Sequence, residues 1–157
     1  MRYTKKTVAT AETIYADPSA LLKLYLNEPQ SRAMTGWRAR IRTPVLLTHH
    51  GRVEMQNGIC LAAHRGIITD ATCEAALAAF DDDLEQGRYV VADMLWRATL
   101  NRAGKLSRQF TRELGCRSLD VLHVASALEL KCRSLLTFDA RQQQLARGVK
   151  LKLLVPA

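Results

Sequence analysis

The chain has 157 residues, of which 48% are hydrophobic and 24% charged, and its formal net charge is +8 at pH 7. This length suits one domain with a buried core, and no segment has the roughly 18 uncharged apolar residues of a membrane span. The composition excludes a membrane-spanning protein and favours a soluble, globular one. The positive charge favours a polyanionic partner such as nucleic acid.

The N-terminal segment and the cysteines favour a reducing, cytoplasmic compartment. Residues 1–12 are basic and then polar, without the apolar run of a secretory signal. We interpret them as a poorly defined lead-in to a single domain spanning residues 1–157. The cysteines stand at positions 60, 73, 116 and 132, too far apart for a C-x-x-C pair. Buried free thiols in a reducing cytoplasm explain this spacing.

Short apolar and β-branched runs alternate with longer segments of helical period, which is typical of a parallel sheet covered by helices. In chain order, the pattern predicts a strand at 13–16, helices at about 19–27 and 31–41, a strand at 44–48, helices at about 49–64 and 70–86, a strand at 88–91, helices at about 94–113 and 118–130, a strand at 134–138, a helix at 140–147 and a strand at 151–155. The predicted fold class is therefore α/β.

Four of the fifteen acidic residues fall where a parallel sheet would gather them. Asp17 follows the first predicted strand and Asp139 follows the fourth. Asp120 lies in the first turn of the helix at 118–130, and Glu54 lies in the helix after the second strand. Ligands of open α/β sheets bind outside the carboxyl ends of the strands. If the strands are parallel neighbours, the four carboxylates converge.

Such a cluster of carboxylates points to a metal ion. Carboxylates within several ångströms of one another repel, which raises some of their pKa values unless a cation neutralises them. Hard oxygen ligands call for Mg²⁺ or Mn²⁺, and either ion can activate a water for attack on a phosphodiester. A basic surface around the acidic pocket would hold an RNA backbone.

Each acidic residue also has a structural interpretation. Asp17 precedes a proline, as a normal helix N-cap does. Asp139 with Gln142 resembles a capping box. Asp120 suits the positive end of its helix dipole, and Glu54 could simply be solvated. The conjunction of all four, with the residues around them, favours the functional interpretation.

The sequence around these positions resembles the PIN-domain family, and more narrowly the VapC-type toxins of bacterial toxin–antitoxin modules. The similarity runs from about residue 14 to residue 155. It rests on four blocks, which are DPSALLKLY from Asp17, Glu54 with Asn57, RSLDVLHVASA from Arg117 and TFDAR from Thr137. The last two blocks are the most specific, whereas the first two alone would be weak evidence for the family.

The resemblance implies a three-layer α/β/α fold with a central parallel sheet, and an endoribonuclease that cleaves RNA with Mg²⁺ or Mn²⁺. It also implies a homodimer and a cognate antitoxin that blocks the pocket. Pro18 departs from the family, which more often has Thr or Ser there, and could remove a backbone donor from the pocket. Carried over position by position, the metal-binding and catalytic residues are Asp17, Glu54, Asp120 and Asp139, supported by Ser19 and Thr137.

Three histidines lie near these blocks. His123 follows Asp120 by three residues, so it could reach the metal pocket. A neutral histidine in an apolar helix more often forms a structural hydrogen bond, and we favour that interpretation. His49 and His50 are adjacent and point in different directions on a helix, which does not make a ligand pair. They are left without a role.

Other charged residues leave alternatives open. The three aspartates at 81–83 are interpreted as a solvated surface. Arg117 and Arg141 could contact phosphates or be exposed helix residues. Asp120→Asn is predicted to leave the metal-free fold at least as stable, because relief of carboxylate repulsion should offset the lost helix-dipole interaction.

Two other functions compete with a metal-dependent ribonuclease. One is a phosphotransfer protein or phosphatase, but the second aspartate typical of that class is replaced by Ser19. The other is a catalytically silent PIN-like domain that only binds RNA or a protein. Such a domain normally lacks some of the carboxylates, whereas all four are present here, and it is the main alternative.

Overall fold

The computed structural model describes residues 13–157, and the lead-in predicted at residues 1–12 lies outside the described residues. Its centre is a five-stranded sheet in the order β3-β2-β1-β4-β5, in which every pair of neighbours is parallel. The predicted α/β class with a central parallel sheet is confirmed. The strands are β1 (Ile14–Ala16), β2 (Val45–Thr48), β3 (Tyr89–Ala92), β4 (Ser134–Leu136) and β5 (Lys152–Leu154).

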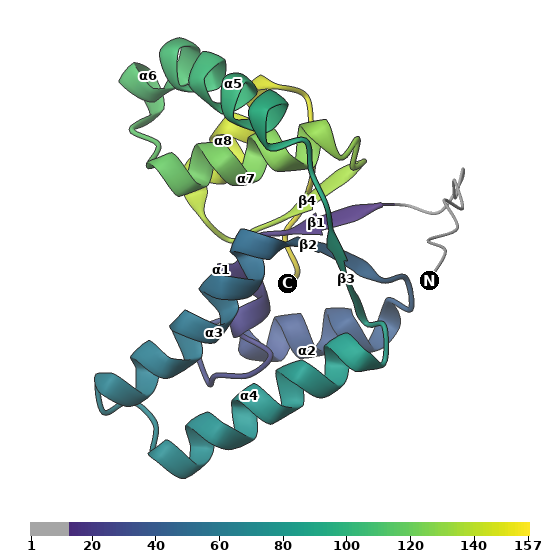
Figure 1. Ribbon diagram of the computed structural model, residues 1–157, viewed down its shortest axis with the longest axis vertical. Coiled ribbons are helices and arrows are strands. Elements are labelled where there is room, and N and C mark those ends of the chain that lie inside the picture. Colours follow the sequence, from purple (N-terminus) through teal and green to yellow (C-terminus); the bar gives the residue numbers. More distant parts are fainter. Residues whose placement is uncertain (1–12) are drawn as a thin grey trace.

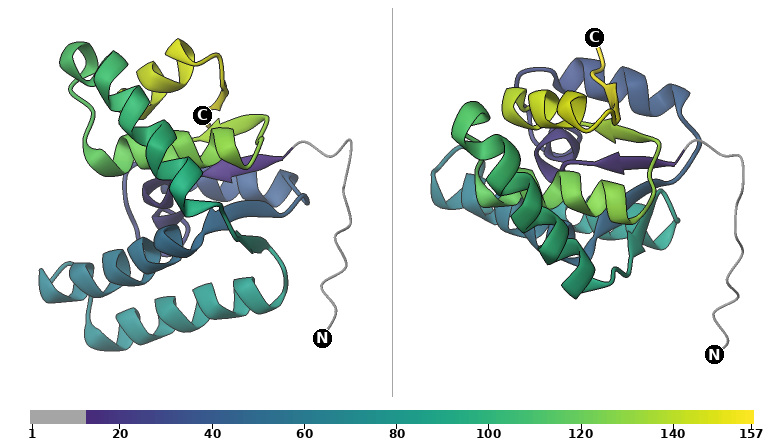
Figure 2. Two further views of the ribbon diagram at one scale, coloured as in Figure 1. Left: turned by 45° about the horizontal axis from the view of Figure 1, so that its top comes forward. Right: turned by 90° about the horizontal axis from the view of Figure 1, so that it is seen from above.

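Helices cover both faces of the sheet, which makes the three-layer α/β/α arrangement that we predicted (Figures 1 and 2). One face packs against α1 (Pro18–Leu22), α2 (Ser31–Arg40), α3 (His49–His64) and α4 (Asp70–Glu85). The opposite face packs against α5 (Trp96–Leu106), a π-helical turn η1 (Ser107–Thr111), α6 (Arg112–Leu114), α7 (Ser118–Glu129) and α8 (Ala140–Gly148).

The alternation of side chains along β1 divides the apolar core into two parts. Ile14 and Ala16 pack into the cluster under α1 to α4, together with residues such as Met55. Tyr15 points the other way, into the cluster under α5 to α8 with Val124. All three residues of β1 are at most 2% exposed. Burial on both faces explains why this strand reads as a continuous apolar run.

The order of the strands determines where a ligand can bind. From β1 the chain moves outward to β2 and β3, and then crosses back to place β4 on the other side of β1. Pairing continues past the strand ends, since the backbone N–H of Asp17 donates to the carbonyl of Leu136 at 3.0 Å. The carboxyl ends of β1 and β4 therefore flank the topological switch point, where open α/β sheets bind their ligands.

Two predicted helices differ in extent from those observed. The helix expected at 19–27 begins at Pro18 and ends at Leu22, after which i→i+3 hydrogen bonds, such as Leu24 N–H to Leu21 O at 2.9 Å, form tighter turns. The helix expected at 94–113 is interrupted by the π-helical turn η1. Sequence periodicity does not distinguish these local changes of hydrogen-bond pattern.

Two predictions about polar and thiol side chains are partly wrong. Cys60 is exposed, although the other three cysteines are buried as expected. In the run 81–83, Asp83 is not a solvated residue, because its carboxylate accepts a hydrogen bond from the Tyr25 hydroxyl and pairs with Arg88 at 3.2 Å. Burial, with Tyr89 and Asp83 nearby, raises the pKa of Tyr25.

None of the helices in residues 13–157 combines the length and the hydropathy needed to cross a membrane.

Candidate active site

Asp17 lies directly after β1 and is only 3% exposed. Its carboxylate caps α1 by accepting from the backbone N–H and the hydroxyl of Ser19, and it also accepts from the Thr137 hydroxyl at 3.1 Å. Pro18 occupies the first helical position. The backbone donor to this carboxylate comes from Ser19, so the proline leaves that hydrogen bond intact.

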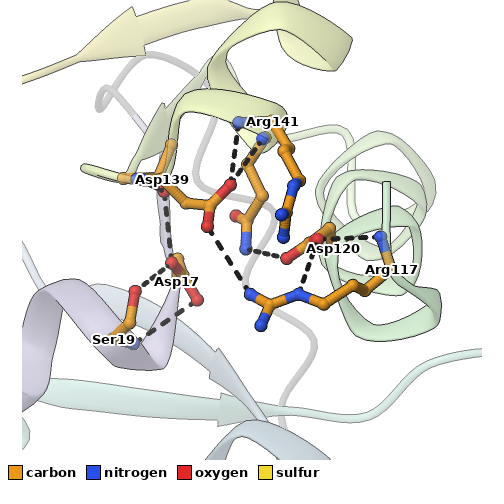
Figure 3. Close-up of polar contacts among 8 residues, drawn as sticks. Asp17, Ser19, Arg117, Asp120, Asp139 and Arg141 are labelled. Carbon is orange, nitrogen blue, oxygen red and sulfur yellow. Dashed lines mark hydrogen bonds and ion pairs between the residues drawn. The ribbon is translucent and has the colours of Figure 1, made fainter. Parts of the chain in front are cut away.

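Asp139 lies after β4 and caps α8. Its Oδ1 accepts from the backbone N–H groups of Arg141 at 2.8 Å and Gln142 at 3.0 Å. Thr137 joins the two strand ends, because its hydroxyl donates to Asp17 and accepts from the backbone N–H of Asp139 at 3.0 Å. The expected capping box is incomplete, because the Asp139 N–H donates to Thr137 and not to Gln142 Oε1. Oδ2 of Asp139 remains directed toward the pocket (Figure 3).

Asp120 lies in the first turn of α7 and is 3% exposed. Its Oδ2 accepts from the Arg117 backbone N–H at 2.9 Å and from Arg117 Nε at 3.3 Å, and its Oδ1 accepts from Gln142 Nε2 at 3.3 Å. Burial alone would raise the pKa of this carboxyl, but the hydrogen bonds from Arg117 and Gln142 outweigh it, and the pKa lies below its ordinary value.

Arg117 connects two of the carboxylates. Its guanidinium contacts Asp120 through Nε at 3.3 Å and Asp139 Oδ2 through Nη2 at 3.6 Å, and Figure 3 shows it between them, opposite Asp17. The Arg117 side chain is 68% exposed. It is therefore a cation at the mouth of the site, free to exchange its carboxylate partners for an incoming anion.

Glu54 reaches the same site from α3. Its Oε1 lies 2.9 Å from His123 Nε2, and the other ring nitrogen, Nδ1, lies 2.7 Å from the Tyr15 hydroxyl. His123 is 1% exposed and Tyr15 is fully buried. Burial raises the pKa of Tyr15, so its hydroxyl stays protonated. The structural hydrogen bonds that we favoured for His123 are confirmed, and through them this residue positions Glu54.

The four predicted acidic residues line one cavity of about 440 Å³ at the switch point. Ser19 also lines it, and Thr137 lies behind it through its hydrogen bond to Asp17. The remaining lining residues are Arg117, Ser118, Leu119, His123 and Gln142. Carboxylate oxygens are the hard ligands that Mg²⁺ and Mn²⁺ prefer, but among the described residues no three of these four carboxylates have oxygen atoms within 4.8 Å of one another. The Arg117 guanidinium between Asp120 and Asp139 marks a position where the pocket already accommodates positive charge.

Sequence reasoning missed one member of this site and one neighbour of it. Gln142 appeared only as a capping partner, although its amide donates to Asp120. His50 was left without a role, yet its ring stacks on that of His123 with centroids 5.0 Å apart. Burial, and then the neighbouring His123, lowers the pKa of His50 to about 4. The only sequence signal for His50 was its spacing of four residues from Glu54, which puts the two side chains on one helix face.

Comparison with known proteins identifies the family and the fold. The chain belongs to the PIN-domain family, because the model of that family matches residues 14–148. No curated protein matches the sequence. Similarity to solved structures is found at low sequence identity, where it concerns the fold.

Three solved structures illustrate this similarity. VapC20 from Mycobacterium tuberculosis, described as a sarcin-ricin loop cleaving toxin, has a TM-score of 0.63 and 17% identity over 84% of this chain and 94% of its own. FitAcB from Neisseria gonorrhoeae has a TM-score of 0.60 and 16% identity, and the match covers 90% of this chain and 96% of FitAcB. VapBC2 from Rickettsia felis was solved bound to a DNA fragment from its promoter. It has a TM-score of 0.63 and 14% identity, and the match covers 92% of this chain and 99% of the chain in that structure. This chain shares its fold with these proteins.

Proposed function

We propose that this protein is an endoribonuclease dependent on Mg²⁺ or Mn²⁺, and the toxin of a toxin–antitoxin module. One observation carries the proposal: carboxylates from four separate parts of the chain, Asp17, Glu54, Asp120 and Asp139, line a single cavity at the switch point of the sheet. The main alternative is a PIN-like domain that binds RNA or a protein without cleaving. The complete set of carboxylates favours the enzyme.

The residues of the pocket would have two roles, which are to bind the metal ion and to position its ligands. Asp17, Asp120 and Asp139, with Glu54 at the edge, would hold the metal ion. When bound, the ion supplies a water of lowered pKa and positive charge for the phosphodiester oxygens. Thr137 fixes the spacing of the two strand-end carboxylates through one hydroxyl, and Ser19 orients Asp17.

Arg117 would bind the substrate. A guanidinium can donate two parallel hydrogen bonds to a phosphate, and this one is largely exposed at the mouth of the pocket. When a metal ion neutralises Asp120 and Asp139, Arg117 no longer has to balance their charge and becomes available to the RNA backbone. Arg141 is exposed beside Asp139 and can add a second contact. The net charge of +8 would attract RNA over a longer range.

A protein partner is supported by apolar residues exposed around the start of α5. Leu95, Trp96 and Leu100 are 79%, 42% and 54% exposed. Exposed apolar patches of this kind mark contacts with other proteins. We assign this surface to a homodimer contact, and the cognate antitoxin to the mouth of the acidic pocket. The buried thiols of three cysteines support a reducing, cytoplasmic setting.

The test is cleavage of structured RNA by the purified full-length chain with Mg²⁺, with Mn²⁺ and with a chelator. Asp139→Asn is expected to lower the rate by orders of magnitude, because it removes a metal ligand. Asp81→Asn, an exposed aspartate on α4, is the matched control and should keep the wild-type rate. RNA binding without metal-dependent cleavage by the wild-type chain would identify the silent PIN-like domain instead.

A further inference from the structure

A second group of possible metal ligands lies at one side of the acidic pocket and includes two of its lining residues, Glu54 and His123. It consists of His50, Glu54 and His123, each of which offers one ligand atom within 4.8 Å of the other two. No other such group of three occurs among the described residues. Two of the three ligands are imidazoles. Nitrogen ligands are typical of Zn²⁺ and other transition metals, whereas Mg²⁺ prefers oxygen alone. The cluster therefore differs in chemistry from the carboxylates of the acidic pocket.

The fold brings these side chains together from two helices. His50 and Glu54 are one turn apart on α3, and His123 comes from α7 on the other face of the sheet. The rings of His50 and His123 are nearly parallel, with an interplanar angle of 28°. Glu54 Oε1 already lies 2.9 Å from His123 Nε2. Ligands of a tetrahedral ion with bonds of about 2.0–2.1 Å stand roughly 3.3 Å apart, so only small side-chain movements are needed.

Each histidine is also oriented as a metal ligand is. Metal-bound histidines usually use their second ring nitrogen in a hydrogen bond that fixes the ring. In His123, Nδ1 pairs with the Tyr15 hydroxyl at 2.7 Å, which leaves Nε2 toward Glu54. In His50, Nε2 pairs with the Thr48 hydroxyl at 3.2 Å. Its Nδ1 is buried and has no hydrogen-bond partner among the described residues, and a bound ion would satisfy it.

We propose that His50, Glu54 and His123 form a binding site for a divalent transition-metal ion such as Zn²⁺, at the side of the acidic pocket that Glu54 and His123 line. Three protein ligands leave the fourth tetrahedral position for water. Tyr15 makes the site adaptable, because a hydroxyl can either donate to His123 Nδ1 or accept from it. His123 can therefore turn a lone pair on Nε2 toward the ion without losing its hydrogen bond to Tyr15.

The two sites share Glu54 and His123, and the shared carboxylate gives the second site a regulatory consequence. A zinc ion bound to Glu54 would withdraw that carboxylate from the acidic pocket. If the proposed ribonuclease activity holds, micromolar Zn²⁺ should inhibit Mg²⁺-dependent cleavage, and His50→Ala should relieve the inhibition. This consequence rests on the proposed function, whereas binding of the ion does not.

Binding is therefore tested without RNA. Co²⁺ is added to the full-length chain, its visible absorption is recorded, and Zn²⁺ is used to displace it. A tetrahedral Co²⁺ ion with nitrogen ligands absorbs far more strongly than an octahedral one with oxygen ligands. Replacing residues behind metal ligands typically costs roughly 10–100-fold in affinity, so loss of the ligand in His50→Ala should cost at least about 100-fold. Tyr15→Phe should cost roughly 10-fold.

Two matched variants make the outcome decisive. His49→Ala removes the neighbouring histidine, whose side chain is 58% exposed and bonded to Asp93, and should bind Co²⁺ as the wild type does. Asp139→Asn alters only the acidic pocket and should also bind normally. Equal affinity in His50→Ala and wild type, or a loss confined to Asp139→Asn, would overturn the proposed site. If His50→Ala fails to fold by circular dichroism, His50→Gln serves the same purpose.

Discussion

The carboxylate of Asp120 offers a direct test of whether the pocket's charges stabilise or strain the metal-free fold. It is 3% exposed and accepts hydrogen bonds from the Arg117 backbone, the Arg117 side chain and Gln142. Asp120→Asn keeps the size of the side chain and removes its charge. The sequence led us to expect unchanged or increased stability, because repulsion between carboxylates would be relieved. The observed contacts predict the opposite.

The expected loss follows from the contacts that depend on charge. Hydrogen bonds to charged groups contribute about 1.5–3 kcal/mol, against roughly 0.5–1.5 kcal/mol for neutral ones. The favourable interaction with the helix dipole adds about 0.3–1 kcal/mol. Gln142 limits the damage, because its Oε1, which lacks a partner among the described residues, can accept from the new amide after the Gln142 amide rotates. Combining these values, we expect a loss of about 1–3 kcal/mol in the free energy of unfolding.

The loss is measured by thermal unfolding in metal-free buffer. For a chain of this size each kcal/mol corresponds to roughly 2–4 °C in Tm. Because the pKa of Asp120 is lowered in the folded state, its stabilisation is present above the unfolded pKa of about 3.9 and disappears as the pH falls through the lower folded value. The difference between wild type and variant should therefore be full at pH 7 and shrink toward pH 3.

Asp81→Asn is the control, and a change within about 0.5 kcal/mol is expected for this exposed position. A variant Asp120→Asn that melts at the wild-type temperature or higher at pH 7 would refute the reasoning. Repulsion within the carboxylate cluster would then outweigh the hydrogen bonds from Arg117 and Gln142.

Three further predictions concern other parts of the molecule. Tyr25→Phe removes the hydroxyl that donates to Asp83 and should lower stability by about 1–3 kcal/mol, because the partly buried Asp83 carboxylate keeps only Arg88 as a partner. Urea unfolding measures this loss, and an unchanged midpoint would contradict it. Thr137→Val removes the hydroxyl shared by Asp17 and Asp139 and should weaken Mn²⁺ binding roughly 10–100-fold. Calorimetry measures this affinity, and an unchanged value would show that the hydroxyl does not organise the ligands. RNA binding should weaken steeply between low and moderate salt, because phosphate contacts release counterions; a flat salt dependence would assign the +8 charge to another role.

The layers of the fold could be predicted from local sequence patterns, because each strand and helix has its own periodicity. The positions of Asp17 and Asp139 follow from the same reasoning. Each residue lies just after a short apolar strand, and these two strands are parallel neighbours at the switch point. The π-helical turn η1 could not be predicted in this way. No proline interrupts residues 96–114, and the Phe110 ring lies so close to Gly148 that an added Cβ there would approach it within 2.8 Å. That contact joins α8 to a segment almost 40 residues earlier, so the local sequence around η1 does not indicate it.

The contacts of Arg117, His123 and Gln142 were hidden for a related reason. Each side chain had an ordinary explanation within its own helix, as an exposed residue, a core histidine or a cap. Each of them also has a partner in another element: Arg117 contacts Asp139 before α8, and His123 contacts Glu54 on α3. Such contacts depend on how α3, α7 and α8 pack around the sheet, and helical spacing alone does not report that packing.

The placement of β4 beside β1 also has a consequence for the timing of synthesis. Thr137 and Asp17, which meet at the base of the pocket, are 120 residues apart in the chain. At translation rates of roughly 5–20 residues per second, several seconds separate the emergence of the first carboxylate from that of its partners. A nascent chain has folded neither β4 nor α8 and therefore lacks the pocket. The carboxylates from the two ends of the chain therefore come together only after the segment from β4 to α8 has been synthesised.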